Sequence, residues 1–210
     1  MKKLIFVSTG RCGTKRIAQI LRKYLPNEFS VVHQMRFSRL ANLIGNLLYY
    51  ISVSDKVKTE VYNMIISRYS RGSYFICSDP LSAMIIPKNL VDSDDVCIVH
   101  IVRDSGFFAE SFFKLSRSRP GSFVAHNFIP LWQIGLLPVE NILSQNILEK
   151  YKGIAEKKNN FFRKTYSCNP NFLQVDMPDI FKTNTLSKII YNFFDYKMII
   201  PEEELKIKSN

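Results

Sequence analysis

Cysteine and histidine are scarce in this chain of 210 residues, and neither occurs in a metal-binding spacing. The four cysteines, Cys12, Cys77, Cys97 and Cys168, include no CxxC pair, and the three histidines lie far from any cysteine doublet. This pattern gives no structural zinc site and is unlike a disulfide framework. We therefore expect a protein of a reducing compartment, the cytoplasm, with no metal site.

Long apolar runs are also missing. The longest apolar region, 40–53, is interrupted by three polar residues and falls short of the ~20 residues that a membrane-spanning helix needs. At the start of the chain only four apolar residues, Leu4–Val7, follow two lysines, which is too few for a signal peptide. We expect a soluble protein with no transmembrane segment.

Acidic residues are too few to balance the basic ones, so the formal net charge is +11. Hydrophobic residues make up 46% and charged residues 22%, values typical of a globular protein, and the length suits a single domain over residues 1–210. The positive charge favours an anionic partner: nucleic acid, a membrane surface or a small ligand with several phosphates. The oligomeric state is not readable from the sequence.

Short apolar runs alternate with segments of helical periodicity, which predicts an α/β fold of three layers, with helices on both faces of a mostly parallel sheet of four to five strands. In such sheets, ligands bind at the carboxyl ends of the strands. Residues 121–138 show no periodicity and are expected to be a loop or short helices that line a site. The expected strands are Leu4–Val7, Phe29–His33, Tyr74–Cys77, Val96–Val102 and Phe172–Val175, and the expected helices are Thr14–Leu25, Ser38–Ile51, Asp55–Tyr69, Ser105–Ser118, Val139–Tyr166 and Asn184–Tyr196.

The segment Ser8–Lys15 has the composition of an anion-binding turn between the first strand and the first helix. Its small residues and two glycines allow a tight curve in which backbone N–H groups point inward. Arg11 and Lys15 add full positive charges, and Thr14 adds a hydroxyl group. The alternative is an ordinary turn with incidental basic residues, but position and composition both favour a phosphate site.

A kinase-type phosphate loop, GxxxxGK[ST], does not fit this segment. The interval from Gly10 to Gly13 is too short, and Arg16 stands where the magnesium-binding Ser or Thr should follow Lys15. Only Asp79 or Asp104 is available as a metal-binding carboxylate. An atypical kinase using ATP and magnesium therefore remains an alternative rather than the first interpretation.

Three blocks of the chain resemble the sulfotransferases that use 3′-phosphoadenosine-5′-phosphosulfate. Residues 10–14, Gly-Arg-Cys-Gly-Thr, resemble the family's phosphosulfate loop, and a strand ending in Arg103 is followed eight residues later by Ser111, like the pair that binds the donor's 3′-phosphate. Residues 173–177 resemble a later strand and acid. An arginine fork and a serine about two helical turns away can converge on one dianion, which makes physical sense of the pair.

The resemblance implies a P-loop-like sulfotransferase fold and transfer of a sulfuryl group to a hydroxyl or amine of a carbohydrate, lipid or small molecule. Arg11 would hold the phosphosulfate and stabilise charge on the bridging oxygen. Because a sulfuryl group carries less negative charge than a phosphoryl group, protein cations suffice and no metal is required. The donor-binding residues so implied are Gly10, Arg11, Cys12, Gly13, Thr14, Lys15, Arg103 and Ser111.

The acceptor must lose a proton, which requires a general base. His33 is the first candidate, because it follows the second expected strand and a histidine titrates near neutrality. Asp79, which follows the third expected strand, is the second candidate. Neither has the residue type that the resembled family uses at the matching place, so the base stays open.

The acceptor itself is not readable from the sequence. The expected acceptor loops, 34–38 and 121–138, suit a sugar, a lipid head group or a phenol. A further alternative is a non-catalytic nucleotide- or polyanion-binding protein; nucleic acid is not expected, because no strand interleaves aromatic and basic residues. His100 is expected to be a core residue, and the pair Lys157-Lys158 is expected on a solvated helix face.

Overall fold

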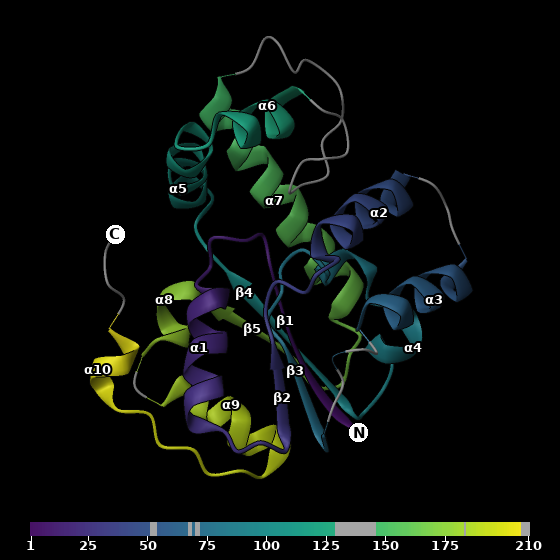
Figure 1. Ribbon diagram of the computed structural model, residues 1–210, viewed down its shortest axis with the longest axis vertical. Coiled ribbons are helices and arrows are strands. Elements are labelled where there is room, and N and C mark those ends of the chain that lie inside the picture. Colours follow the sequence, from purple (N-terminus) through teal and green to yellow (C-terminus); the bar gives the residue numbers. More distant parts are fainter. Residues whose placement is uncertain (51–53, 67–68, 70–71, 129–145, 183, 207–210) are drawn as a thin grey trace.

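Five parallel strands form the centre of the computed structural model, which describes residues 1–50, 54–66, 69, 72–128, 146–182 and 184–206 (Figure 1). The strand order across the sheet is β2-β3-β1-β4-β5, and every neighbouring pair runs in the same direction. The predicted α/β class is therefore confirmed. The strands are β1 (Lys2–Ser8), β2 (Phe29–Val32), β3 (Tyr74–Cys77), β4 (Val96–Val102) and β5 (Phe172–Asp176).

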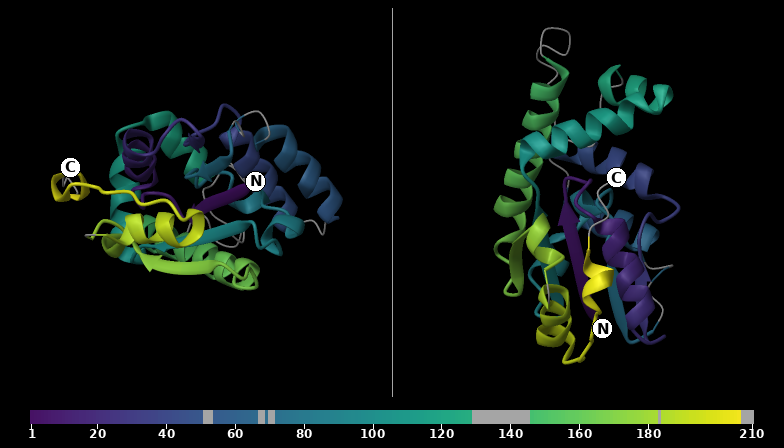
Figure 2. Two further views of the ribbon diagram at one scale, coloured as in Figure 1. Left: turned by 90° about the horizontal axis from the view of Figure 1, so that it is seen from below. Right: turned by 90° about the vertical axis from the view of Figure 1, so that its left-hand side faces the viewer.

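Helices cover both faces of the sheet, with α1 and α7 on opposite sides, as the two views of Figure 2 show. The helices are α1 (Thr14–Tyr24), α2 (Ser38–Tyr50), α3 (Asp55–Ile66), α4 (Lys88–Val91), α5 (Ser105–Arg117), α6 (Pro120–Phe128), α7 (Ile147–Tyr166), α8 (Met177–Ile180), α9 (Thr185–Phe194), α10 (Glu202–Leu205) and the short 3₁₀ helix η2 (Ala83–Ile85). None of the helices in the described residues is long and apolar enough to span a membrane.

The alternation of side chains along β1 divides the core into two layers. Leu4 and Phe6 pack with residues of α1 and α9, whereas Ile5 and Val7 pack with residues of α2, α3 and α7. All four side chains are at most 2% exposed. A strand buried on both faces reads as a continuous apolar run, which is why this strand was predictable from the sequence.

The topology of the sheet shows where its strand order reverses. The chain runs from β1 to β2 and β3 on one side, and then crosses to β4 on the other side of β1. β1 and β4 are in register from Lys3↔Val96 to Ser8↔Ile101, so their carboxyl ends lie together. Ligands of open parallel sheets bind in the crevice at such a reversal of strand order.

Two predicted segments can be compared with the structure in part. Residues 121–128 of the aperiodic region belong to the short helix α6, one of the two forms expected there, which begins at Pro120, a residue suited to the first turn of a helix. The predicted helix Val139–Tyr166 is α7 from Ile147 onward, where the Asn146 side chain caps it by accepting a hydrogen bond from the Leu148 backbone N–H at 2.9 Å. Residues 129–145 of these two predictions lie outside the described residues.

The expectation of a solvated face for Lys157 and Lys158 is wrong for Lys158. Lys157 is exposed, but Lys158 is completely buried, on the same row of α7 as Ile154 and Phe162. Residues four apart share one face of a helix, and here that face packs against α5 at Ile154 and against the sheet at Phe162. The sequence pattern near Lys158 is basic, yet its place in the row makes it a core position.

Candidate active site

The loop that joins β1 to α1, residues 9–13, turns back sharply through three left-handed backbone positions. Gly10 has φ 92°, Arg11 has φ 56° and Gly13 has φ 73°. The turn is held by the Gly10 N–H, which donates to Ser8 Oγ at 3.2 Å, and by Cys12 Sγ, which donates to the Gly10 carbonyl at 3.1 Å. A tight turn of backbone N–H groups next to a helix N-terminus is the kind of backbone that can bind an anion.

Gly13 is required by its surroundings as well as by its φ angle. A Cβ atom at this position would lie 2.6 Å from two ring carbons of Phe181, which follows α8. The Gly13 carbonyl accepts the first hydrogen bond of α1, from the Ile17 N–H at 3.0 Å. The close packing of Phe181 therefore leaves room only for glycine at the residue that precedes α1.

Cys12 has no side chain available to a ligand. Its thiol is fully buried beneath the loop, and this burial raises the pKa of Cys12. A reactive thiolate is therefore disfavoured, and the residue contributes to the loop through its small size and its bond to Gly10. Only its backbone remains for the role that the resemblance implies.

The structure brings Arg103 and Ser111 against Arg11. Arg103 Nη1 donates to the Arg11 carbonyl at 2.5 Å, and Arg11 Nε donates to Ser111 Oγ at 3.0 Å. Partial burial, followed by the nearby charges of Arg103 and Arg119, lowers the pKa of Arg11. The positive charges of Arg11 and Arg103 lie near each other just beyond the carboxyl ends of β1 and β4, an arrangement that attracts an anion.

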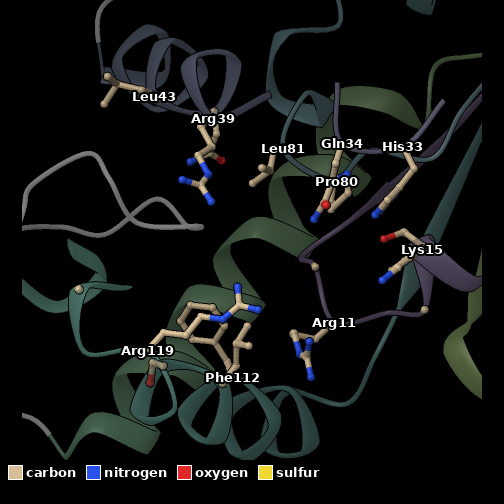
Figure 3. A pocket seen from close by; sticks show the side chains of 17 residues that line it. Arg11, Lys15, His33, Gln34, Arg39, Leu43, Pro80, Leu81, Phe112 and Arg119 are labelled. Carbon is tan, nitrogen blue, oxygen red and sulfur yellow. The ribbon is translucent and has the colours of Figure 1, made fainter. Parts of the chain in front are cut away.

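A pocket of about 590 Å³ opens beside the loop (Figure 3). Six of the site residues predicted from the sequence line the pocket: Gly10, Arg11, Gly13, Thr14, Lys15 and His33. Four predicted residues do not line it: Cys12, Asp79, Arg103 and Ser111. The predicted set therefore divides into a group on the pocket wall and the Arg103–Ser111 pair, which adjoins it through Arg11.

His33 follows the end of β2 and is held in one orientation. Its Nδ1 lies 2.6 Å from the Ser78 carbonyl oxygen, which can only accept, so Nδ1 carries the proton of that bond. In the neutral ring, Nε2 is then the unprotonated nitrogen. Figure 3 shows the imidazole on the same side of the pocket as Lys15. This tautomer is the one in which Nε2 acts as a base.

Asp79 is placed beneath the pocket rather than in its wall. The residue is 1% exposed, and one carboxylate oxygen accepts from the Leu81 N–H at 3.0 Å. The other oxygen accepts from the Met35 N–H at 3.3 Å and from the Ser38 hydroxyl. Asp79 thereby ties the end of β3 to the loop that follows β2 and to the first residue of α2.

His100 is buried in β4, as expected of a core residue. Its Nε2 lies 3.1 Å from Asn159 Oδ1, and burial lowers the pKa of the ring. His126 belongs to the expected acceptor loop 121–138, and its side chain lies outside the described residues. Among the residues that the structure describes, no group of three His, Cys, Asp or Glu side chains is arranged to hold a metal ion.

Sequence reasoning missed Arg39 and Arg119, which also line the pocket. Arg39 lies in the first turn of α2, directly after the expected acceptor loop 34–38, and Arg119 lies between α5 and α6. Gln34 and Gly121, at the starts of the two expected acceptor loops, line the same pocket. The sequence feature that could have pointed to Arg39 and Arg119 was their position next to those two loops.

Comparison with known proteins gives one distant likeness. No family model matches the chain, and no curated protein matches its sequence. The chain is similar to a solved structure described as a sulfotransferase domain from the curacin biosynthetic pathway, with 12% identity, a TM-score of 0.45, and coverage of 97% of this chain and 76% of that one. At this distance, function has to be read from the chain's own residues.

Proposed function

We propose that this protein is a sulfotransferase that moves a sulfuryl group from 3′-phosphoadenosine-5′-phosphosulfate to a hydroxyl or amine. The observation that carries the proposal is the contact of Arg11 with both Arg103 and Ser111. The resemblance assigns the loop arginine to the phosphosulfate and the other two residues to the 3′-phosphate. Their convergence is what binding of one molecule with both groups requires.

In the proposed reaction, the acceptor oxygen or nitrogen bonds to sulfur while the bond from sulfur to the bridging phosphate oxygen breaks. The bridging oxygen leaves with the electron pair, as part of 3′-phosphoadenosine-5′-phosphate, and the acceptor's proton passes to His33 Nε2. Arg11 and Lys15, both on the pocket wall, offset the negative charge of the leaving phosphate. The buried free thiols Cys12, Cys77 and Cys97 are compatible with the cytoplasmic location that we include in the proposal.

The carboxylates that a magnesium-dependent kinase would use are engaged elsewhere. Asp79 is buried and accepts three hydrogen bonds, and Asp104 caps α5 by accepting from the Phe107 N–H at 3.0 Å. Binding magnesium through Asp79 would disturb hydrogen bonds to both of its carboxylate oxygens, and Asp104 has one of its two oxygens committed to the helix cap. This supports sulfuryl transfer over the kinase alternative.

The proposal is tested by calorimetric binding of 3′-phosphoadenosine-5′-phosphate, AMP and magnesium-ATP to the wild-type protein. We expect the bisphosphate to bind in the presence of a metal chelator, at least tenfold more tightly than AMP, because only the bisphosphate can reach Arg103 and Ser111. Equal affinity for AMP and the bisphosphate would refute the donor assignment. A requirement for magnesium would favour the kinase.

Substitution of His33 separates the two candidate bases. His33→Gln should lower kcat about 100-fold, because a positioned base contributes at least that much, while affinity for the bisphosphate stays within twofold. Asp79→Asn should instead lower the thermal unfolding temperature, because its carboxylate accepts three hydrogen bonds inside the fold. Transfer from radiolabelled donor to screened alcohols, phenols and amines gives kcat. A fall in kcat for a stably folded Asp79→Asn variant, with full activity of His33→Gln, would reverse the assignment.

A further inference from the structure

The pocket is lined by more positively charged side chains than the proposed donor binding requires. Besides Arg11 and Lys15, it includes Arg39 and Arg119, and the part of the chain that the structure describes contributes no carboxylate to the lining. Figure 3 shows Arg39 and Arg119 approaching the space between them from opposite sides, one from α2 and the other from the end of α5. Cations that face one another across a cavity create a site for an anion.

The side chains of these two arginines have no structural partner in the part of the chain that the structure describes. Within the described residues, the guanidinium groups of Arg39 and Arg119 form no hydrogen bond and no ion pair. Arg39 lies in the first turn of α2, which has no acidic residue, and a cation at that end of a helix opposes the helix dipole. Arg119 adds to the repulsion that lowers the pKa of Arg11. An anion bound between the two arginines would offset these costs.

Apolar side chains line the pocket between the arginines. Leu43 of α2 lies near Arg39, Leu81 follows β3, and Phe112 of α5 lies near Arg119; Leu115 of α5 also lines the pocket. His33 and Lys15 lie on another side of the same space. A molecule with its reacting hydroxyl at His33 would therefore place its body against apolar side chains and its far end between the arginines.

We propose that the acceptor is a hydroxylated molecule with an apolar body and an anionic group, and that the anionic group binds between Arg39 and Arg119. This inference rests on the proposed sulfuryl transfer, since it assigns the pocket to the acceptor. A carboxylate, a phosphate and a sulfate share the required chemistry, because an arginine fork accepts each of them through paired hydrogen bonds. Neutral sugars and neutral phenols lack it.

Matched probes that differ only in charge test the inference. Binding of 3-(4-hydroxyphenyl)propionate and of its amide, and of 12-hydroxydodecanoate and of its amide, is measured on protein saturated with 3′-phosphoadenosine-5′-phosphate. We expect each acid to bind at least tenfold more tightly than its amide. Phenyl phosphate and phenyl sulfate, titrated in the same way, distinguish the three anionic groups. Equal affinity of acid and amide in both pairs, including no binding by any of them, would overturn the inference.

Variants locate the preference. Arg39→Gln and Arg119→Gln should each weaken binding of the acids about tenfold and leave the amides unchanged, whereas Arg117→Gln should change neither. Arg117 is a matched control, because it is exposed at the end of α5 and does not line the pocket. An equal loss in the Arg117 variant would show a nonspecific charge effect and overturn the assignment to this pair.

Measuring the affinity of the same variants for the donor product distinguishes failure of the acceptor inference from failure of the proposed function. Affinity for 3′-phosphoadenosine-5′-phosphate should stay within twofold in Arg39→Gln and Arg119→Gln. If it falls as much as the affinity for the acids, the arginines belong to the donor site and the acceptor inference fails while the donor assignment stands. If the wild-type protein does not bind the bisphosphate, the proposed function fails, and the acceptor inference, which rests on it, fails too.

Discussion

Replacing Arg103 with alanine is expected to weaken binding of 3′-phosphoadenosine-5′-phosphate roughly 10- to 100-fold, because a hydrogen bond to a charged group contributes about 1.5–3 kcal/mol. Arg103 stands at the end of β4, where its guanidinium reaches the Arg11 carbonyl at 2.5 Å. AMP, which lacks the 3′-phosphate, should lose much less affinity. Ser111→Ala should show the same selectivity with a smaller loss, about three- to tenfold.

The comparison of the two nucleotides separates binding from loop support. Arg103 also holds the β1–α1 loop through its bond to Arg11, so a purely structural role would weaken AMP and the bisphosphate equally. Arg117→Ala, at the exposed end of α5, is the matched control and should leave both affinities unchanged. Calorimetry gives the affinities, and thermal unfolding shows that each variant is folded. Unchanged affinity of Arg103→Ala for the bisphosphate would refute the donor site.

Replacing Lys158 with methionine is expected to stabilise the protein. The Lys158 ammonium is fully buried, without a hydrogen-bond partner among the described residues, and burial lowers the pKa of this lysine to about 7, against the opposing effect of Asp79. Holding the charged form inside the fold costs up to about 5 kcal/mol near neutral pH. Methionine keeps a flexible apolar chain beside Phe162, and Asp79 keeps its three hydrogen bonds.

The pH dependence gives the sharper test of Lys158. In the unfolded chain the lysine titrates near its ordinary pKa of 10.5, so between about pH 7 and 10.5 the unfolded state binds more protons and the folded state gains stability as pH rises. The advantage of Lys158→Met should therefore be largest at pH 7 and below, and fall to about 2 kcal/mol near pH 9.

Urea unfolding at several pH values measures this advantage. The exposed neighbour Lys157 supplies the control, and Lys157→Met should change the free energy of unfolding by no more than about 0.5 kcal/mol at any pH. A Lys158→Met variant less stable than wild type at pH 6 would mean that the buried ammonium is paired after all.

The sequence by itself determined the order and type of the elements that carry the proposed donor-binding residues. Val96–Val102 and Tyr74–Cys77 were predicted with the bounds that the structure has, because a strand buried on both faces is a continuous apolar run between polar residues. The β1–α1 loop was predictable for a similar reason. Its glycines and its place between a strand and a helix are local properties, which can be recognised from a short stretch of sequence.

Tertiary structure alone decided which chemistry each charged residue can perform. Asp79 was a candidate base because it follows a strand. In the structure, both oxygens of its carboxylate accept hydrogen bonds, from the loop after β2, from the start of α2 and from its own turn. Lys158 sits in a basic stretch, yet the face of α7 that it shares with Phe162 packs on the sheet and buries its charge.

Arg39 and Arg119 became a pair only because α2 and the end of α5 lie on opposite sides of one pocket. Sequence spacing shows which residues share a helix face or a strand end, but only for residues that are close together in the chain. The burial of a charge and the charges that surround it depend on segments far away in the sequence. Electrostatic function at this site is therefore a property of the packing of α2, α5 and α7 around the carboxyl edge of the sheet.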